Sequence, residues 1–303
     1  MYVYVVQQLI NALAYGSVLG LLAVGYTMIY GILGLINFAH GEIFMAGAFA
    51  CYLLVNALHL PFMIGAVGAV VASILTGLLL YKIVYQPCIK RKAPVLAVFI
   101  ASFGASLAIK YLFMMFFGDK RRAFPIPEYL TGVHVIGQIT INTRDFVMLI
   151  ATIIIMIIIA YLIKYTRVGI AMRAVSYNMK IAEVMGVDSI KIVVVAFIIG
   201  SALAGISAVQ YGLNFSILYP NMGFTPGLEG FIGAVLGGIG NVPGAMIGGF
   251  IIGIGEILFV ALLPSSFSAV RPMFVWGLLF LILFLKPTGL FRPNVKYEGI
   301  WGE

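Results

Sequence analysis

Long stretches without a charged side chain dominate the pattern of hydrophobic and polar positions in this 303-residue chain. Residues 1–41, 43–81, 192–228 and 230–255 contain no Asp, Glu, Lys or Arg. A helix needs about 20 consecutive apolar residues to cross the hydrocarbon core of a bilayer, so each stretch can hold one or two crossings. The pattern therefore predicts an all-α, polytopic membrane helix bundle.

Nine apolar segments can be delimited, and two of them are short for a full crossing. The predicted ranges are 5–33, 43–57, 62–85, 93–116, 146–163, 190–212, 228–240, 244–263 and 270–286. The short ones, 43–57 and 228–240, are candidates for broken or re-entrant helices, which persist in a membrane only when they are buried in protein or line a cavity. We therefore expect eight or nine membrane segments in a single transmembrane domain covering residues 1–303.

Composition excludes a water-soluble globule. Hydrophobic residues make up 63% of the chain and charged residues only 9%, where soluble domains carry about 25% charged residues. The polar residues fall in short connections, which leave no room for a separate soluble domain. The net charge of +8 is therefore attributed to loops that face anionic membrane lipid, and nucleic acid is not expected as a partner.

The distribution of Lys and Arg predicts the orientation in the membrane, because loops on the cytoplasmic side carry an excess of them. Twelve of the 18 basic residues lie in regions 82–92 and 164–191 and in the tail from Lys286. These regions are predicted to be cytoplasmic, and the C-terminus with them. The loop 117–145 is then placed outside, although it carries four basic residues.

A polar cluster, Asn37 to Glu42, lies between two apolar segments. Polar and ionisable groups at membrane depth are costly, so Asn37, His40 and Glu42 are expected to pack against other helices and not against lipid. His40 and Glu42 are two residues apart, which does not fit the spacing of a helical metal pair, and neither a metal site nor a catalytic site is expected. Two hypotheses remain: a hydrogen-bonded turn between broken helices, or, with Gly41, part of a translocation path or gate.

Glu229 and Glu256 also lie in apolar surroundings. Buried carboxylates of this kind can relay protons or cations in an ion-coupled transporter, and they can equally accept hydrogen bonds between helices. Both residues are candidates for the translocation path.

Glycine is concentrated near the C-terminal end of the chain. Between Gly223 and Gly255 there are 12 glycines in 33 residues, several of them four apart. In lipid, small residues let helix backbones approach closely. The cluster predicts either tight packing alone or packing that also lines a path, with Gly237, Gly238 and Gly240 as candidates.

Nucleotide chemistry is not encoded in this chain. It contains neither a phosphate-binding G-x-x-x-x-G-K-[ST] loop nor a G-x-G-x-x-G after a strand. The chain is therefore expected not to be an enzyme and to need no cofactor, and active transport would need a partner that hydrolyses nucleotide.

The segment 169–186 is too polar to cross a membrane and predicts a single short helix over 171–185. This helix either lies on the membrane surface or docks a cytoplasmic subunit, and it belongs to a predicted coupling loop at about 165–189. The candidate coupling residues are Arg173, Ala174, Ala182, Glu183 and Gly186.

Four blocks of sequence, in order along the chain, resemble the family of branched-chain amino-acid ABC transporter permeases. They are Gly31–Glu42 (GILGLINFAHGE), Arg173–Ala174 followed by Ala182 and Gly186, Ala234–Ala245 (AVLGGIGNVPGA) and Lys286–Phe291 (KPTGLF). The resemblance is closest to the H-type subunit of the Liv system, rather than to its longer M-type partner.

This resemblance implies a permease subunit of the bacterial inner membrane that imports leucine, isoleucine, valine or related amino acids. It implies an M-type second permease subunit, two cytoplasmic ABC ATPase subunits that hydrolyse the ATP, and a periplasmic amino-acid-binding protein. Related systems carry urea or short amides, so that solute class stays an alternative. An ion-coupled secondary transporter is a further alternative.

Overall fold

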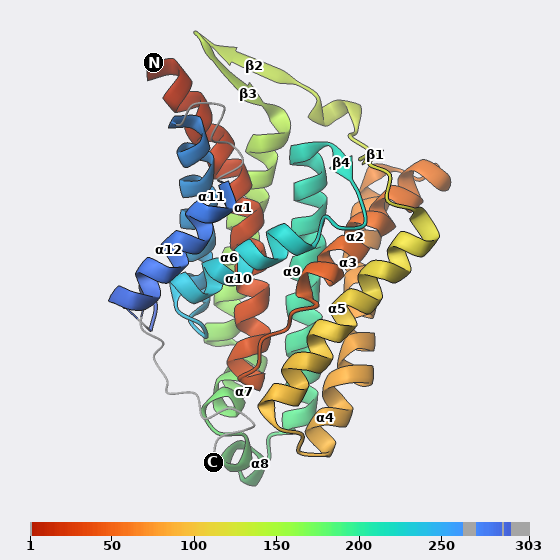
Figure 1. Ribbon diagram of the computed structural model, residues 1–303, viewed down its shortest axis with the longest axis vertical. Coiled ribbons are helices and arrows are strands. Elements are labelled where there is room, and N and C mark those ends of the chain that lie inside the picture. Colours follow the sequence, from red (N-terminus) through yellow and green to blue (C-terminus); the bar gives the residue numbers. More distant parts are fainter. Residues whose placement is uncertain (1, 263–270, 287, 292–303) are drawn as a thin grey trace.

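The computed structural model describes residues 2–262, 271–286 and 288–291. Six of the described helices are long and apolar enough to cross a membrane (Figure 1). They are α1 (Tyr2–Leu33), α3 (Phe62–Leu80, continued by a π-helical turn at Tyr81–Tyr85 and by α4, Gln86–Lys90), α5 (Val95–Phe117), α6 (Thr143–Tyr165), α9 (Ser189–Phe215) and α11 (Val242–Leu262). Helices satisfy every backbone N–H and C=O within one segment, which the bilayer core demands. The predicted polytopic helix bundle is confirmed.

Two further helices are too short to cross. The helices α2 (His40–Tyr52, followed by a π-helical turn at Leu53–Ala57) and α10 (Phe224–Gly237) have 13 and 14 residues. At 1.5 Å per residue α10 is about 20 Å long, and α2 with its π-helical turn is about 25 Å long, against a hydrocarbon core of about 30 Å. The expectation of short or broken helices is thus confirmed, and α2 and α10 are called the half-helices below. A last apolar helix, α12 (Arg271–Leu285), has 15 residues.

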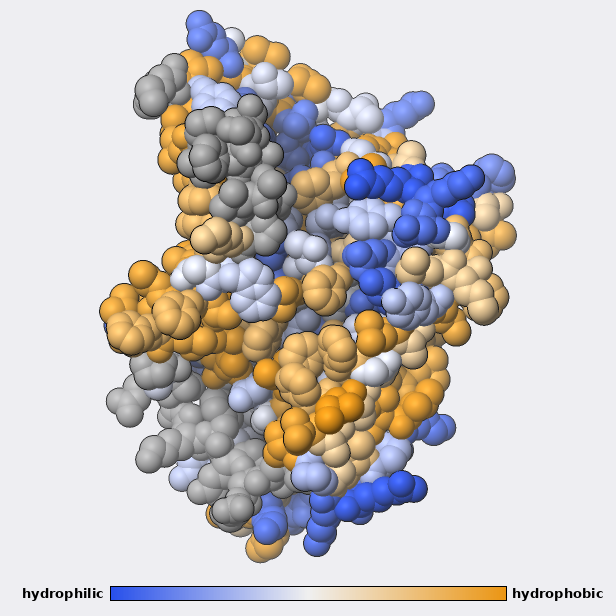
Figure 2. All heavy atoms as spheres, viewed as in Figure 1, coloured by the Kyte–Doolittle hydropathy of each residue, from blue (hydrophilic) through white to orange (hydrophobic). Residues whose placement is uncertain are grey.

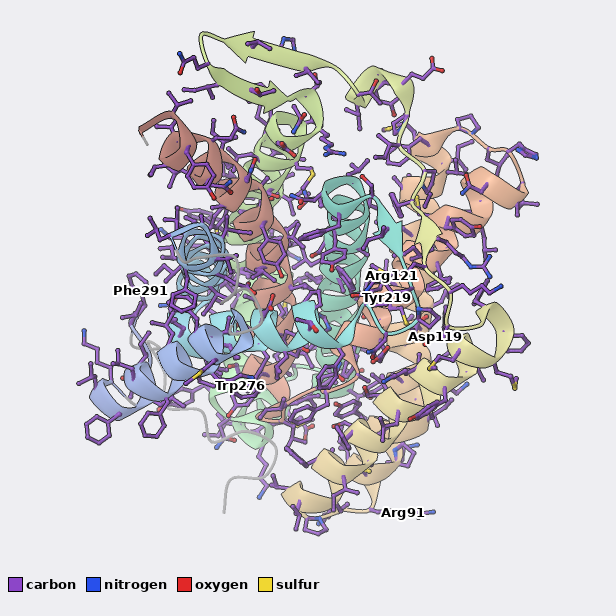
Figure 3. All side chains as sticks on the ribbon, turned by 45° about the horizontal axis from the view of Figure 1, so that its top comes forward. Arg91, Asp119, Arg121, Tyr219, Trp276 and Phe291 are labelled. Atoms are coloured by element: carbon purple, nitrogen blue, oxygen red, sulfur yellow. The ribbon has the colours of Figure 1, made fainter. Side chains whose placement is uncertain are left out.

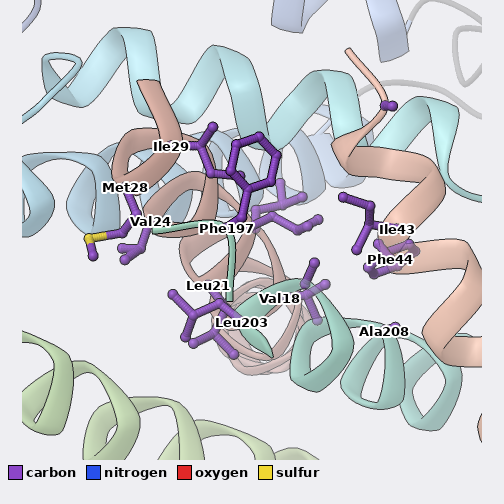
Figure 4. Close-up of a cluster of buried hydrophobic side chains, with 14 of the residues drawn as sticks. Val18, Leu21, Val24, Met28, Ile29, Ile43, Phe44, Phe197, Leu203 and Ala208 are labelled. Atoms are coloured by element: carbon purple, nitrogen blue, oxygen red, sulfur yellow. The ribbon is translucent and has the colours of Figure 1, made fainter. Parts of the chain in front are cut away.

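The centre of the bundle is α1, which is buried along nearly all of its apolar length and packs against α11, α9, α10 and α6. Figure 4 shows part of this core, where Val18, Leu21 and Val24 of α1 meet Phe197 and Leu203 of α9. Most of the apolar length of α3, α5 and α6 is instead only half-buried or exposed. Hydrophobic side chains accordingly cover much of the middle of the molecule in Figure 2. This arrangement fits a core of helices inside a layer that faces lipid.

Glycines hold α1 against α11. A Cβ atom added to Gly253 would lie 2.5 Å from the Cα of Gly16, and one added to Gly249 would lie 2.6 Å from the Cα of Gly20. Carbon atoms in ordinary contact are about 3.5–4.0 Å apart, so no side chain fits at this interface. These four glycines are called the glycine seam below. They confirm the predicted close packing of the glycine-rich segment.

The order long helix, half-helix, long helix occurs twice in the chain. It is found in α1, α2 and α3, and again in α9, α10 and α11, where the long helices run in the opposite direction (Figure 1). Inverted repeats of this kind are common in transporters, where interrupted helices meet near the middle of the membrane. Here the pattern brings the beginnings of the two half-helices together.

The connections that were predicted to lie on opposite sides of the membrane lie at opposite ends of the bundle. The α4 turn and the segment 164–191 share one end, and the loop 117–145 lies at the other (Figure 1). The sidedness itself, with the first end in the cytoplasm, stays a prediction. The tail from residue 292 lies outside the described residues, so its predicted side is not tested.

The loop 117–145 and the α9–α10 connection contain short strands that the all-α prediction did not include. Strand β1 (Arg122–Ala123) pairs antiparallel with β4 (Ile217–Leu218), and β2 (Val133–Ile136) forms a hairpin with β3 (Ile139–Asn142). Loop residues also contact each other across these connections, since the Arg121 guanidinium lies 5.6 Å from the centre of the Tyr219 ring (Figure 3). Strand pairing satisfies backbone groups that leave the helices here.

Candidate functional site

The polar cluster after α1 is a hydrogen-bonded turn. Helix α1 ends at Leu33, and Gly34 follows with a φ of +67°, a conformation that glycine adopts without steric cost. The Asn37 side-chain oxygen then accepts the Ala39 N–H at 3.1 Å, and the Asn37 carbonyl accepts the His40 N–H at 3.2 Å. This turn starts the half-helix α2 inside the protein. The hydrogen-bonded turn was predicted, but it does not lie between two broken helices, because α1 before it is 32 residues long.

The half-helices touch backbone to backbone at this turn. A Cβ atom on Gly227 would lie 2.8 Å from the Cα of Gly41, and one on Gly41 would overlap the carbonyl of Gly223. The first turns of α2 and α10 therefore face each other, and both carry N–H groups that have no partner within their own helix. Gly41 was predicted from the sequence, but Gly223 and Gly227 were not singled out. Their spacing of four residues was the available signal.

Glu42 lies in the first turn of α2 and is only 2% exposed. Ser106 of α5 donates a hydrogen bond to its Oε1 at 3.4 Å, and Oε2 has no hydrogen-bond partner among the described residues. The carboxyl group borders a cavity of about 30 Å³ that Tyr26, Gly41 and Gly227 also line. A cavity of this size has room for a water molecule. An ionisable group so placed within the membrane indicates a functional site.

His40 is fully buried beside this cavity wall. Its ring lies against the Tyr26 ring, edge to face, with 4.5 Å between centres, and neither ring nitrogen has a hydrogen-bond partner among the described residues. A Cβ atom on Gly25 would lie 2.6 Å from the His40 Nε2, so the glycine leaves the space that the imidazole needs. With Asn37 also only 2% exposed, all three polar residues pack within the protein as predicted.

The other two acids are buried on different helices. Glu229 of α10 accepts a hydrogen bond from the Tyr15 hydroxyl of α1, and Glu256 is fully buried on α11. The bond between Tyr15 and Glu229 supports the hypothesis of hydrogen bonding between helices. Tyr15 was not predicted from the sequence. It lies 214 residues from Glu229, and no sequence pattern links positions so far apart.

The predicted path glycines form the turn between α10 and α11. Gly238 and Gly240 have φ values of +98° and +89°, and a Cβ on Gly237 would overlap the backbone of Gly244. The Leu290 N–H donates to the carbonyl of Leu236 at 2.8 Å, so the segment after α12 binds beside this turn. The positive φ values and the close backbone contacts explain why glycine occupies these three positions. Their part in a path stays a prediction.

The predicted coupling helix is two helices rather than one. Helix α7 (Arg167–Tyr177) and helix α8 (Met179–Val184) are separated at Asn178, whose backbone is extended at φ −156° and ψ 113°. The Asn178 side chain accepts the Ile181 N–H at 3.0 Å and so caps α8. The prediction of one continuous helix over 171–185 was therefore wrong. The Asn178 side chain hydrogen-bonds to the backbone itself, and this favours the start of a new helix over the continuation of the first.

The candidate coupling residues occupy different surroundings. Ala182 is buried, Ala174 is half-buried and Glu183 is exposed, while the Arg173 side chain donates to the carbonyl of Ile163. Gly186 has a φ of +86°, which confirms that it provides the sharp exit toward α9. The next helix is capped by Asp188, whose carboxylate accepts the Lys191 N–H at 3.1 Å, and this bond lowers the aspartate pKa.

Exposed apolar side chains gather at the tip of this segment. Val184 and Met185 are 86% and 78% exposed, and Tyr177 and Ile181 are also exposed. These four residues are called the apolar tip below. It lies at the end of the bundle, beyond the membrane-spanning helices (Figure 1). Apolar groups clustered on a surface outside the membrane-spanning helices mark a contact with another protein or with the membrane surface. Sequence reasoning missed the tip, because the burial of each side chain depends on how α7 and α8 fold back.

Clusters of three or more His, Cys, Asp or Glu are absent from the described parts of the chain. A membrane bundle with two half-helices that meet in its interior has the features of a transport permease. The chain belongs to the family described as branched-chain amino acid transport system / permease component, whose match covers residues 8–285.

Several named proteins are similar to this chain over nearly their whole length. The high-affinity branched-chain amino acid transport system permease protein LivH of Escherichia coli is 35% identical over 97% of this chain and 98% of its own. The corresponding protein BraD of Pseudomonas aeruginosa is 34% identical over 96% and 97%. A probable LivH permease of Methanocaldococcus jannaschii is 29% identical over 93% and 89%. No solved structure is significantly similar.

Proposed function

We propose that this chain is the permease subunit of an ATP-driven importer for leucine, isoleucine, valine or related amino acids in a bacterial inner membrane. The proposal includes an M-type second permease subunit, two cytoplasmic ABC ATPase subunits and a periplasmic amino-acid-binding protein. The family match over residues 8–285 carries it, and the names of the similar proteins supply the solute class.

The apolar tip supports a cytoplasmic partner. Its four side chains lie beyond the membrane-spanning helices, where exposure to water costs free energy. The docking hypothesis explains this exposure, since an ATPase surface would cover the tip. A helix lying on the membrane surface would instead turn these side chains toward lipid.

The junction of the half-helices supports a place on the translocation path. Glycine contacts allow α2 and α10 to separate without a side-chain clash, and Glu42 lies directly beside the contact. A path must bind solute weakly enough to release it, which a site made largely of backbone groups can do. In this proposal Glu229 and Glu256 hold helices beside the path.

Transport by the reconstituted complex tests the function. The permease, its M-type partner and the ATPases are placed in liposomes with the binding protein, and uptake of labelled leucine is measured with and without ATP. We expect uptake only with ATP and the binding protein. Uptake by the permease alone, driven by an ion gradient, would instead establish an ion-coupled transporter, and competition by urea but not by valine would establish an amide importer.

Co-purification of the ATPase tests the apolar tip. Val184→Asp places a charge on the tip, and Val135→Asp places the same charge on β2 at the opposite end, where Val135 is 66% exposed. We expect the first variant to insert normally and lose the ATPase, and the control to retain it. Equal retention in both variants contradicts docking at the tip. Gly186→Asp is less informative, because its positive φ makes any substitution there strained.

Uptake by two variants of the junction tests the path. Gly41→Leu removes the backbone contact with α10, whereas Glu42→Gln keeps the shape and removes the charge. Because backbone shape is primary in this proposal, Gly41→Leu is expected to lower uptake more. Gly104→Leu on α5, where the added Cβ meets nothing within 4 Å, is the control. Near-normal uptake in both junction variants removes this turn from the path.

A further inference from the structure

A cavity of about 440 Å³ lies behind α7, separate from the half-helix junction. It is enclosed by the last turns of α1 and α6, by α7 and by the turn before α11. The end of α1, the end of α6 and α7 lie toward the end of the bundle predicted to be cytoplasmic (Figure 1). Its volume corresponds to roughly 15 water molecules at about 30 Å³ each.

The walls of the cavity divide into an apolar part and a basic part. Most of the lining is apolar, including Met28 and Ile32 of α1 and Ala160 and Ile163 of α6. Lys164 and Arg173 also line it, and none of its lining residues in the described part of the chain is acidic. A ligand that matches both parts has an anionic group and a hydrocarbon chain.

One basic side chain at the cavity has hydrogen-bonding capacity left over. The Thr27 hydroxyl of α1 is buried beneath the cavity wall and is not reached from the cavity. The Arg173 guanidinium donates to the carbonyl of Ile163, and its further N–H groups can bind another acceptor. Together with Lys164, this guanidinium suits the cavity to a ligand that supplies anionic oxygen atoms.

We propose that this cavity binds one anionic phospholipid from the adjacent leaflet. The phosphate lies between Lys164 and Arg173, and an acyl chain follows the apolar wall of α1 and α6. Basic pockets between membrane helices at the cytoplasmic surface bind anionic headgroups in this way. The proposal does not depend on the solute or on the ATPase partner. It makes the lipid a support for α7 on the side away from the apolar tip.

Native mass spectrometry of the full chain tests this site. The protein is released from detergent with phosphatidylglycerol or with phosphatidylcholine of the same acyl chains, and the retained lipid is titrated. We expect one phosphatidylglycerol to be retained in preference to phosphatidylcholine. Lys164→Gln is expected to weaken this retention about fivefold, the effect of one cation near an anionic lipid.

A second variant and a matched control separate the proposal from a general charge effect. Ala160→Leu extends a side chain from the apolar wall into the cavity and is expected to weaken retention while leaving every charge in place. Lys82→Gln removes an exposed lysine at the same end, outside the cavity, and should retain the lipid as the wild type does.

Three results overturn the proposal. They are equal retention of the two lipids by the wild type, equal weakening by Lys164→Gln and Lys82→Gln, and displacement of phosphatidylglycerol by glycerol phosphate at equal concentration. The last result would assign the site to a free phosphate compound, because the acyl chain would then contribute nothing.

Discussion

The glycine seam permits a quantitative test of how α1 is held in the bundle. In Gly253→Ala the new Cβ lies 2.5 Å from the Cα of Gly16, about 1 Å closer than carbon atoms tolerate, so the two helices must separate by about that distance. Overpacking of this kind costs about 1–3 kcal/mol. Alanine also favours the helix over glycine by about 1 kcal/mol, so the net loss of stability is expected to be about 0–2 kcal/mol.

A control isolates the packing part of this loss. Gly104→Ala on α5 brings the same gain in helix propensity, and its Cβ meets nothing within 4 Å. The difference in unfolding free energy between Gly253→Ala and Gly104→Ala should therefore equal the overpacking cost of about 1–3 kcal/mol. In the double variant with Gly249→Ala the second substitution should cost less than the first, since the helices have already separated.

Reaction of a fluorescent maleimide with Cys51 supplies the assay. Cys51 is fully buried on α2 and becomes reactive when the bundle opens, and Cys88→Ser removes the only other thiol. Apparent melting temperatures are compared at one heating rate, because unfolding of such proteins is commonly irreversible. If Gly253→Ala and Gly104→Ala melt together, or if the two seam substitutions are fully additive, the seam is not a tight contact.

Three other measurements test buried and capping polar contacts. Thr152→Val removes the partner that lies 2.9 Å from the Gln210 Nε2 between α6 and α9, and should lower the unfolding free energy by about 0.6–1.7 kcal/mol in the same assay. Tyr15→Phe removes a donor to Glu229 and should cost about 1–3 kcal/mol; an unchanged melting temperature would show that the bond contributes nothing. The folded state lowers the pKa of Asp188, so its contribution is complete above the ordinary aspartate pKa and is lost as the pH falls through the lowered value. The stability difference between wild type and Asp188→Asn should therefore be constant above about pH 5 and shrink in acid, and a difference that grows in acid contradicts this sign.

Much of the bundle was predictable, because each membrane segment carries its own signal. Apolar runs of sufficient length delimit helices within about five residues, since the predicted range 62–85 compares with an observed helical stretch from Phe62 to Lys90. The half-helices were predictable for the same reason, since 43–57 is too short to cross. These features depend on local sequence and on the thickness of a bilayer.

The contacts that build the site were less predictable, because they join distant parts of the chain. Gly41 meets Gly223 and Gly227 only after both half-helices are in place, and the sequence contains many other glycines that could have met. The break at Asn178 was missed because apolar and polar positions keep a helical period across it. A single asparagine cap was enough to divide the helix.

The central position of α1 has a consequence for the order in which the protein is made. This helix leaves the ribosome before α9 and α11, which bury it and end at Phe215 and Leu262. At roughly 5–20 residues per second, α1 waits about 10–50 s for α11. During that time its glycines face lipid or the insertion machinery, and the hydroxyl of Tyr15 has not yet met Glu229. A nascent chain that stalls before α9 therefore presents an unsatisfied first helix, which a membrane protease or chaperone can recognise.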